Sequence, residues 1–400
     1  MRLGVILRYS GYILVFNSIF LLISAAISLA DSDTARFPLA YSAIISILFG
    51  VFPILFVPST NDISNKEGFV IVVSSWLVSC LIGALPYTLW GDVFTFTNGW
   101  FESVSGFTTT GSTILTDIER LPRGLLFWRS ATHWIGGIGI IIFVLSVLPS
   151  TGRVGMILYR TETSSLASDN FRQQTKKALT ILIYVYIGLT ALETICLLLC
   201  GLSFFDSITH AFGTIATGGF STKNASIAFY QSVAVETVVT VFMILSGIHF
   251  GLLFLAITGK VSELWQSTVV RYYLAMLILG SLVVTLDIHE RIYDGWADAL
   301  RYALFQVISL GTSTGFATTD TSFWPSFSQL VLVFFTLQCA CASSTSGGIK
   351  ADRFVMFWKA IRKRILKIKH PRAVIAPKIN KVAIDEDTLE STLLYICLYM

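Results

Sequence analysis

The sequence predicts an all-α integral membrane protein made of internal repeats. Of its 400 residues, 54% are hydrophobic and 13% are charged, and the mean hydropathy is +0.73. Soluble domains average about 25% charged residues, so this chain carries about half the usual share. Long apolar runs alternate with short polar clusters, and a similar glycine-rich stretch recurs three times. This pattern excludes a disordered chain, a collagen-like fibre and a disulfide scaffold, and it disfavours a water-soluble enzyme.

Apolar runs of about twenty residues predict the membrane spans. The first run follows a positively charged start, as in a signal peptide. It continues to Ala30, however, and no small-residue cleavage site precedes a soluble domain, so we interpret it as a retained span. The runs of sufficient length are 3–30, 37–57, 68–90, 125–148, 178–201, 229–257, 270–288 and 324–341, with a weaker candidate at 351–366 and an incomplete one from Leu389.

Three semi-apolar stretches are too short to cross the bilayer. They cover 94–107, 203–215 and 296–309, and each ends in a cluster of Gly, Thr and Ser. A span, a half-helix, a glycine-rich strand and a second span form the layout of a re-entrant pore loop. Irregular backbone at membrane depth is tolerated only where protein surrounds it or water reaches it. We therefore interpret all three stretches as pore half-helices.

The positive charges predict the orientation. The net charge of +4 is too small to indicate nucleic acid binding. Two basic segments should lie in the cytoplasm, and the N-terminus with them. The larger one, 350–381, is either a topology anchor or a surface for anionic lipid or an acidic partner. Its basic residues are Lys350, Arg353, Lys359, Arg362, Lys363, Arg364, Lys367, Lys369, Arg372, Lys378 and Lys381; those of 151–177 are Arg153, Arg160, Arg172, Lys176 and Lys177.

Aligning the three stretches on their last glycine reveals the repeat. The first reads WFESVSGFTTTGST, the second ITHAFGTIATGGFST and the third LFQVISLGTSTGFATTD. The aligned glycines are Gly111, Gly219 and Gly315, spaced by 108 and 96 residues. In this register Glu102, His210 and Gln306 occupy one equivalent position in the half-helices.

These residue types fit a filter for a dehydrated K⁺ ion. Such a filter needs rings of backbone carbonyl and hydroxyl oxygens, and glycine permits the backbone torsions that direct them to one axis. The C-terminal end of each half-helix adds partial negative charge. No Lys or Arg occurs in 106–114, 213–222 or 309–319. The alternative is that these are helix-packing or turn residues, which the three aligned copies disfavour.

The motifs resemble the Trk/Ktr/HKT superfamily of K⁺ transporters, and specifically its TrkH type. The resemblance covers nearly the whole chain, and two spans preceding the first repeat are typical of TrkH. The filter motifs are Thr108-Thr109-Thr110-Gly111, Ala216-Thr217-Gly218-Gly219-Phe220-Ser221-Thr222 and Ser313-Thr314-Gly315-Phe316; similar motifs outside the filter are Trp134-Ile135-Gly136-Gly137-Ile138-Gly139-Ile140, Leu158-Tyr159-Arg160 and His370-Pro371-Arg372-Ala373-Val374.

The resemblance assigns a filter and a gate. It implies K⁺ coordination by Thr109, Thr110, Thr217, Gly218, Ser313 and Thr314, each pair preceding an aligned glycine. It also implies an intramembrane gate loop that interrupts the second span of the third repeat. The matching residues are Ala340, Ser343, Ser344, Thr345, Ser346, Gly347, Gly348 and Lys350. Where the family usually has glycine or a close equivalent, this chain has Cys339, Ala340, Ser343 and Ser346, which predicts altered gating with selectivity retained.

The resemblance also implies a domain division and raises a question about the end of the sequence. It assigns two leading transmembrane helices to 1–60, pore repeats to 61–150, 151–260 and 261–370, and a cytoplasmic linker with the start of a fourth repeat to 371–400. The family has four repeats, and the sequence ends at Met400 before a fourth filter. Three strands would leave polar backbone open to lipid on one side of the ion. The alternative function is therefore a truncated, non-conducting remnant, or a scaffold that receives a fourth repeat from another chain.

Partners follow from the same resemblance. It implies a homodimer in the bacterial inner membrane, with K⁺ as the transported ion, symport or the membrane potential as driving force, and no tightly bound cofactor. Membrane lipid surrounds it, and a cytosolic, nucleotide-binding TrkA-type ring is expected against 350–381 and 151–177. A membrane enzyme remains a rival class, but the sequence offers no constellation of catalytic residues and no CxxC pair for zinc.

Four ionisable residues in the spans are further candidates. Glu193 and Glu236 lie near span ends, so we expect interfacial positions, although an intramembrane carboxylate is a functional candidate by default. His133 precedes the Trp134 motif and is expected to pack rather than to relay protons. His249 stands where the family commonly has Asn and is expected to pack between helices.

Overall fold

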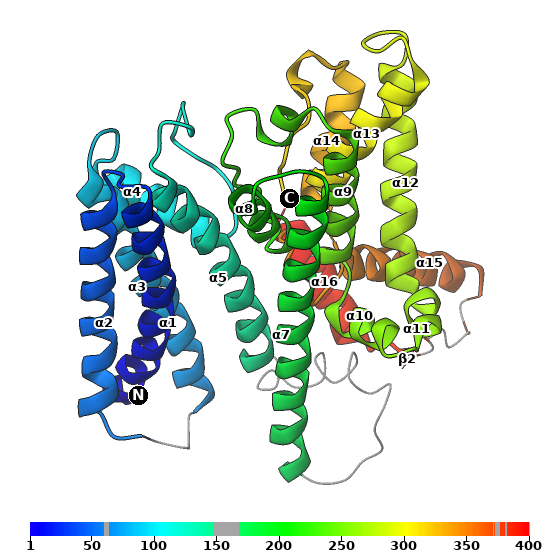
Figure 1. Ribbon diagram of the computed structural model, residues 1–400. Helices are drawn as coiled ribbons and strands as arrows, with labels where there is room; N and C mark the ends of the chain where they lie inside the picture. The colour runs from blue at the N-terminus through cyan, green and yellow to red at the C-terminus, as the bar shows by residue number, and fades with distance from the viewer. Residues whose placement is uncertain are drawn as a thin grey trace. The chain divides into compact units, whose positions relative to one another are not determined.

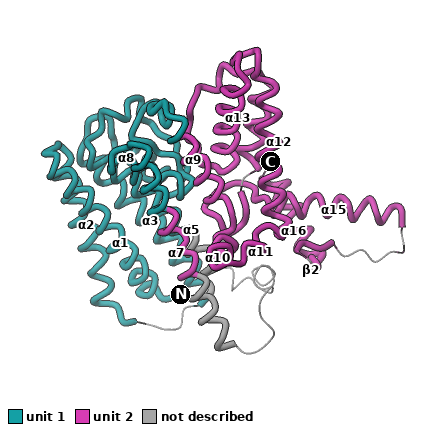
Figure 2. Tube along the Cα trace, turned by 45° about the vertical axis from the view of Figure 1, so that its right-hand side comes forward, with its two compact units in different colours: residues 1–150, 190–235 teal, residues 151–189, 236–400 magenta. Residues whose placement is uncertain are grey.

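The computed structural model describes residues 1–59, 64–147, 168–338, 340–370, 372, 377–380 and 382–399. The chain forms two compact units, coloured separately in Figure 2. The first comprises residues 1–150 and 190–235, and the second comprises residues 151–189 and 236–400. Each unit is described by itself.

Long helices form the body of the first unit. Helix α1 packs along α2 and also contacts α3 and α5, and the half-helix α4 packs between α3 and α5 (Figure 1). Leu21, Tyr87 and Trp128 are fully buried in this core. The elements are α1 (Leu3–Ala30), α2 (Arg36–Phe56), α3 (Asn65–Trp90), α4 (Phe96–Phe107), α5 (Arg123–Val147), α8 (Phe204–Ile215) and the 3-10 turn η2 (Ser226–Tyr230).

The second unit has the same kind of components. Helix α12 packs against the half-helix α13 and against α14, and α15 contacts both α12 and α16. Helix α7 (Ser168–Leu199) contributes to both units. The remaining elements are α9 (Val233–Ser246), α10 (Phe250–Ile257), α11 (Val261–Gln266), α12 (Thr268–Ile288), α13 (Trp296–Gly311), η3 (Thr321–Phe323), α14 (Ser326–Leu337), α15 (Ala351–Lys369), β1 (Lys378–Ile379), β2 (Val382–Ala383) and α16 (Glu386–Tyr399).

The structure confirms an all-helical membrane architecture. Among the described residues, five helices are long and apolar enough to cross a membrane, and the bent pair of α9 and α10 would add a sixth. The five are α1, α2, the 66–90 part of α3, the 179–199 part of α7, and α12. Their lipid-facing sides carry exposed Leu, Ile and Phe side chains, which a soluble fold would bury.

Three predicted spans differ from the structure. The run 229–257 is not one continuous helix, because α9 and α10 meet at an angle of 108°. The run 324–341 yields only the 12-residue α14 before the chain becomes irregular. The run 351–366 does form a helix, α15, but its row of Lys and Arg leaves it outside the set of helices apolar enough to span. A two-stranded hairpin, β1–β2, was not predicted.

Candidate ion filter and gate

The three predicted half-helices are all short, and all end at the same distance from the aligned glycine. Helices α4, α8 and α13 each end four residues before the aligned glycine, at Phe107, Ile215 and Gly311. The first two begin at side-chain caps, where Thr95 Oγ1 accepts from the Asn98 N–H at 3.3 Å and Ser203 Oγ accepts from the Asp206 N–H at 3.1 Å. The 12-residue helices α4 and α8 are about 18 Å long and the 16-residue α13 is about 24 Å long, against a hydrocarbon core of about 30 Å. Each half-helix is therefore too short to cross the bilayer.

The backbone after each half-helix follows one pattern. Thr109, Thr217 and Ser313 have left-handed torsions, with φ of 53°, 52° and 57°. The aligned glycines two residues later are left-handed as well, with φ of 76°, 77° and 83°. Left-handed torsions cost a non-glycine residue about 1–2 kcal/mol. The threefold recurrence of the same strained residue indicates a functional constraint.

Hydrogen bonds fix this strained turn identically in all three repeats. The residue after the left-handed Thr or Ser donates its N–H to the carbonyl five residues earlier. The bonds run from Thr110 to Ser105 at 2.9 Å, from Gly218 to Gly213 at 2.9 Å, and from Thr314 to Ser309 at 2.8 Å. This is the Schellman helix end, here with Thr or Ser where glycine is usual. The structure thus brings the predicted filter residues of each repeat into one repeated geometry.

The equivalent half-helix residues Glu102, His210 and Gln306 are buried, and each holds the segment that leaves its filter strand. Glu102 Oε1 accepts from the Ile114 N–H at 3.0 Å and from the Thr113 hydroxyl. His210 Nε2 lies 2.9 Å from Ser221 Oγ, and Gln306 Nε2 donates to the Thr319 carbonyl at 3.1 Å. The three residues therefore share a role as well as a position.

We call Thr108-Thr109-Thr110-Gly111 filter strand 1, Ala216-Thr217-Gly218-Gly219 filter strand 2 and Ser313-Thr314-Gly315-Phe316 filter strand 3. Filter strands 1 and 2 approach each other within the first unit. A Cβ added to Gly111 would lie 2.1 Å from the Gly218 carbonyl oxygen. A Cβ added to Gly218 would lie 2.3 Å from Nδ1 of His133, which stacks on Phe220 with ring centroids 4.0 Å apart. His133 therefore packs, as predicted. The space at both glycines admits only hydrogen.

Arg129 on α5 is a site residue that the sequence analysis missed. Its guanidinium Nε lies 3.4 Å from Glu102 Oε2, and its Nη1 donates to the Ser221 carbonyl at 3.1 Å. Both members of the ion pair are buried, with side chains 2% and 0% exposed. The signal was present in the sequence, because Arg129 is a charge inside the apolar run 125–148.

The predicted gate loop is an irregular segment between α14 and α15. Its C-terminal end is fixed by the Ile349 N–H, which donates to the Leu337 carbonyl at 3.0 Å. Its tip contacts filter strand 3: Ser313 Oγ lies 3.0 Å from Ser346 Oγ and accepts from the Gly347 N–H at 2.9 Å. Lys350 Nζ donates to the Ser346 carbonyl. The loop residue Cys339 lies outside the described residues.

The break between α9 and α10 supplies partners to the same loop. The Cys341 N–H donates to the Gly247 carbonyl at 3.0 Å, and the Phe250 N–H donates to the Ser343 carbonyl at 3.4 Å. His249 caps α10, because its Nδ1 accepts from the Gly251 N–H at 3.0 Å. The expectation that His249 merely packs between helices was therefore incomplete, since its ring terminates a helix.

The expected interfacial positions of Glu193 and Glu236 stay predictions, and the structure adds that both side chains are buried in protein. Glu193 is fully buried in the first unit. Glu236 on α9 is also buried, and its oxygens Oε1 and Oε2 accept from Nη2 and Nε of Arg301 on α13, both at 2.6 Å. Arg301 is 25% exposed, so the carboxylate is the buried member of this ion pair.

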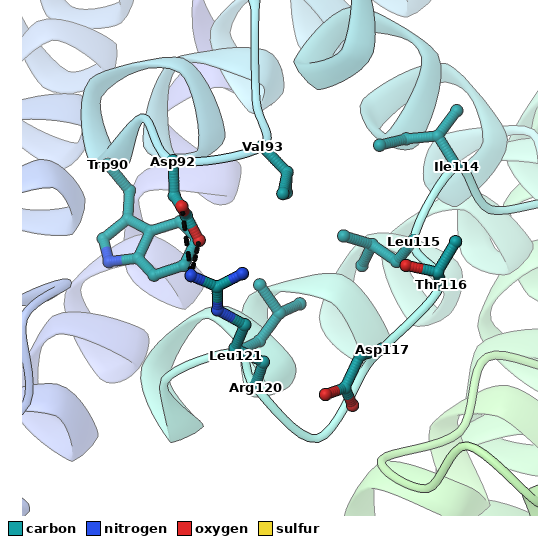
Figure 3. Close-up of a pocket in the computed structure, with 9 residues that line it drawn as sticks. All are labelled: Trp90, Asp92, Val93, Ile114, Leu115, Thr116, Asp117, Arg120 and Leu121. Carbon is teal, nitrogen blue, oxygen red and sulfur yellow. Dashed lines mark hydrogen bonds and ion pairs between the residues drawn. The ribbon is translucent and has the colours of Figure 1, made fainter.

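A small cavity near the loop after filter strand 1 is not an ion site (Figure 3). Its volume is about 60 Å³. The carboxylates in its wall are engaged, because Asp92 pairs with Arg120 at 3.2 Å and Asp117 accepts from Asn224 Nδ2 at 2.8 Å. No group of three His, Cys, Asp or Glu residues that could hold a metal occurs within the described ranges. Its lining residues are Trp90, Asp92, Val93, Ile114, Leu115, Thr116, Asp117, Arg120 and Leu121.

Parts of the basic segments and of two motifs lie outside the described residues. Residues 151–167, including Leu158-Tyr159-Arg160, lie outside the described residues, as do Pro371 and residues 373–376. Helix α15 carries most of the remaining basic cluster, and its Lys363 Nζ donates to Glu386 Oε1 on α16 at 2.8 Å.

Known proteins resemble the chain over nearly its whole length. Residues 39–400 match the model of the TrkH family, described as cation transport protein. The Trk system potassium uptake protein TrkH of Salmonella typhimurium is 32% identical over 398 residues, covering 98% of this chain and 82% of that protein. Potassium uptake protein TrkG of Escherichia coli K12 is 32% identical, covering 84% and 70%. The crystal structure of the potassium transporter TrkH from Vibrio parahaemolyticus has a TM-score of 0.89 at 29% identity, covering 99% and 83%. The chain belongs to the TrkH family of cation transport proteins.

Proposed function

We propose that the chain is the pore-forming subunit of a Trk-type K⁺ uptake system in the bacterial inner membrane. The observation that carries the proposal is the filter geometry repeated after α4, α8 and α13, with its paired left-handed torsions and identical helix ends. The relatives named above are potassium uptake proteins, which agrees with it. In this proposal the ion's ligands come from the carbonyl and hydroxyl oxygens of the filter strands. These are the predicted residues Thr109, Thr110, Gly111, Thr217, Gly218, Gly219, Ser313, Thr314 and Gly315.

The proposed mechanism is electrostatic. The C-terminal ends of the half-helices place partial negative charge at the ion, and the filter oxygens replace its hydration shell. Loop 340–350 forms the gate, because its tip bonds directly to filter residue Ser313. The membrane potential or a symported cation drives uptake. The pore repeats proposed at 61–150, 151–260 and 261–370 each contain one half-helix.

The proposed assembly places the N-terminus and α15 on the cytoplasmic side. The Lys and Arg residues of α15 support this, because segments rich in Lys and Arg are retained on the cytoplasmic side of a membrane. A homodimer with a TrkA-type cytosolic ring against α15 completes the system. Charge reversal of Lys359 and Arg362 tests this surface, and we expect it to weaken co-purification of such a ring while leaving the pore subunit in the membrane.

The direct test of the function is growth and tracer uptake. Expressed in bacteria that lack K⁺ uptake, the chain should support growth at low external K⁺ and take up rubidium tracer. Cells carrying the empty vector provide the baseline, and immunodetection in membranes confirms that the protein is present. Protein present in the membrane without tracer uptake would contradict the proposal and favour the non-conducting remnant or the scaffold.

A further inference from the structure

Arg129 is buried in a place where an unpaired charge could not remain. Its side chain is 2% exposed, and its partner Glu102 is 0% exposed. Removing two charges from water costs several kcal/mol each, which only close pairing and further hydrogen bonds can offset. A buried pair is therefore weak evidence for stability. Its position and its remaining contacts indicate what it does.

The remaining contacts of the pair reach two different filter strands. Glu102 holds Thr113 and Ile114, which follow filter strand 1. Arg129 donates to the carbonyl of Ser221, which follows filter strand 2, at 3.1 Å. One ion pair therefore connects the segments that follow two neighbouring filter strands. The equivalents of Glu102 in the other repeats are the uncharged Gln306 and a histidine, His210.

Arg129 also fixes the side chain next to the second filter glycine. Its Cζ lies 3.5 Å from the ring centroid of Phe220, and the His133 ring stacks on Phe220 at 4.0 Å with an interplanar angle of 15°. His133 Nδ1 further accepts from the Phe220 N–H at 3.4 Å. Both side chain and backbone of the residue after Gly219 are thus held by α5, which belongs to the other repeat.

We propose that Arg129 is a positioning residue for ion selectivity, which acts by holding filter strands 1 and 2 at a fixed separation. The inference rests on the proposed K⁺ uptake function. Discrimination between K⁺ and the smaller Na⁺ depends on how many ligand oxygens surround the ion and how far they can contract around it. Without the Glu102–Arg129 ion pair, the two strands can move closer together around a smaller ion. Na⁺ is then expected to pass while K⁺ still does.

The test compares rubidium and sodium tracer uptake per membrane-inserted protein. The double variant Glu102→Gln/Arg129→Gln keeps the shape of residue 102, shortens residue 129 while retaining a hydrogen-bond donor, and leaves no unpaired charge, so it should fold. We expect its Rb⁺/Na⁺ uptake ratio to fall by about tenfold, the size of one lost hydrogen bond to a charged group, with total cation uptake retained. Arg129→Lys keeps the charge without the planar guanidinium and should give a smaller fall in the same direction.

The matched control is Glu236→Gln/Arg301→Gln. This pair is also charged and its carboxylate is buried, whereas Arg301 is 25% exposed; Arg301 lies on the first half of α13, away from the end that carries the filter. We expect its ratio to equal that of the unaltered chain. An unchanged ratio in Glu102→Gln/Arg129→Gln overturns the inference; should that variant not reach the membrane, an unchanged ratio in Arg129→Lys does so. Absence of uptake by the unaltered chain would instead overturn the proposed function.

Discussion

Replacing Gly111 by alanine is expected to reduce rubidium uptake to the level of cells without the transporter. Gly111 has φ of +76°, and an added Cβ would lie 2.1 Å from the Gly218 carbonyl oxygen. Relief of that overlap must move strand 1 or strand 2, and both carry proposed K⁺ ligands. The measurement is initial tracer uptake, normalised to the amount of protein in the membrane.

Two other glycines separate the causes of this loss. Gly315 has φ of +83° but open space around an added Cβ, so Gly315→Ala adds only the backbone cost of about 1–2 kcal/mol and should retain part of the uptake. Gly188 in α7 also has open space and no positive φ, so Gly188→Ala should behave like the unaltered chain. Full uptake by Gly111→Ala would show that the close approach of the two strands is not required.

The second large effect is expected at the gate, where Ser346→Ala should increase uptake. The Ser346 hydroxyl lies 3.0 Å from Ser313 Oγ, so it ties the loop to the filter strand. A neutral hydrogen bond contributes about 0.5–1.5 kcal/mol, which predicts a rise of roughly twofold to tenfold if the bond breaks on opening. The Rb⁺/Na⁺ ratio should stay constant, because no filter ligand changes. Uptake at or below the level of the unaltered chain would contradict the idea that this hydrogen bond holds the loop closed.

Two glycine variants resolve the earlier expectation that side chains stiffen this loop. Ser346→Gly removes the same hydroxyl and adds backbone freedom, so its uptake should equal or exceed that of Ser346→Ala. Ser343 differs, because its φ of +56° is one that glycine adopts without steric cost. Ser343→Gly therefore also relieves strain in the observed loop conformation and should raise uptake less than Ser346→Gly. Equal uptake by Ser343→Gly, Ser346→Gly and the unaltered chain would exclude a gating role for both serines.

The half-helices were the most predictable part of the fold. The predicted ranges 94–107, 203–215 and 296–309 correspond to observed helices at Phe96–Phe107, Phe204–Ile215 and Trp296–Gly311. Their limits are set by local signals, namely a short apolar segment, a capping hydroxyl in α4 and α8, and a left-handed residue after the end of all three. Such signals are readable in a single sequence because they involve residues close along the chain.

Contacts between distant residues were not predictable in the same way. The hydropathy of 229–257 shows that this segment is apolar, but it does not show where the chain changes direction. The turn at His249 was therefore not predicted. Arg129 and Glu102 are 27 residues apart, and Arg301 and Glu236 are 65 apart. Composition alone cannot show which buried charges meet. The useful signal is the occurrence of positively and negatively charged side chains within apolar runs, because an unpaired charge in such a run would be too costly.

The break between α9 and α10 has a consequence for the proposed gate. It frees a carbonyl at Gly247 and an N–H at Phe250, and the gate loop satisfies both through Cys341 and Ser343. When the loop moves, these groups lose their partners, and each unsatisfied polar group costs several kcal/mol in a dry membrane interior. Loop movement therefore requires water molecules to take over the lost hydrogen bonds. For the proposed gate, opening is then expected to be a wetting transition, in which hydration of the helix break and displacement of the loop both contribute to the energy.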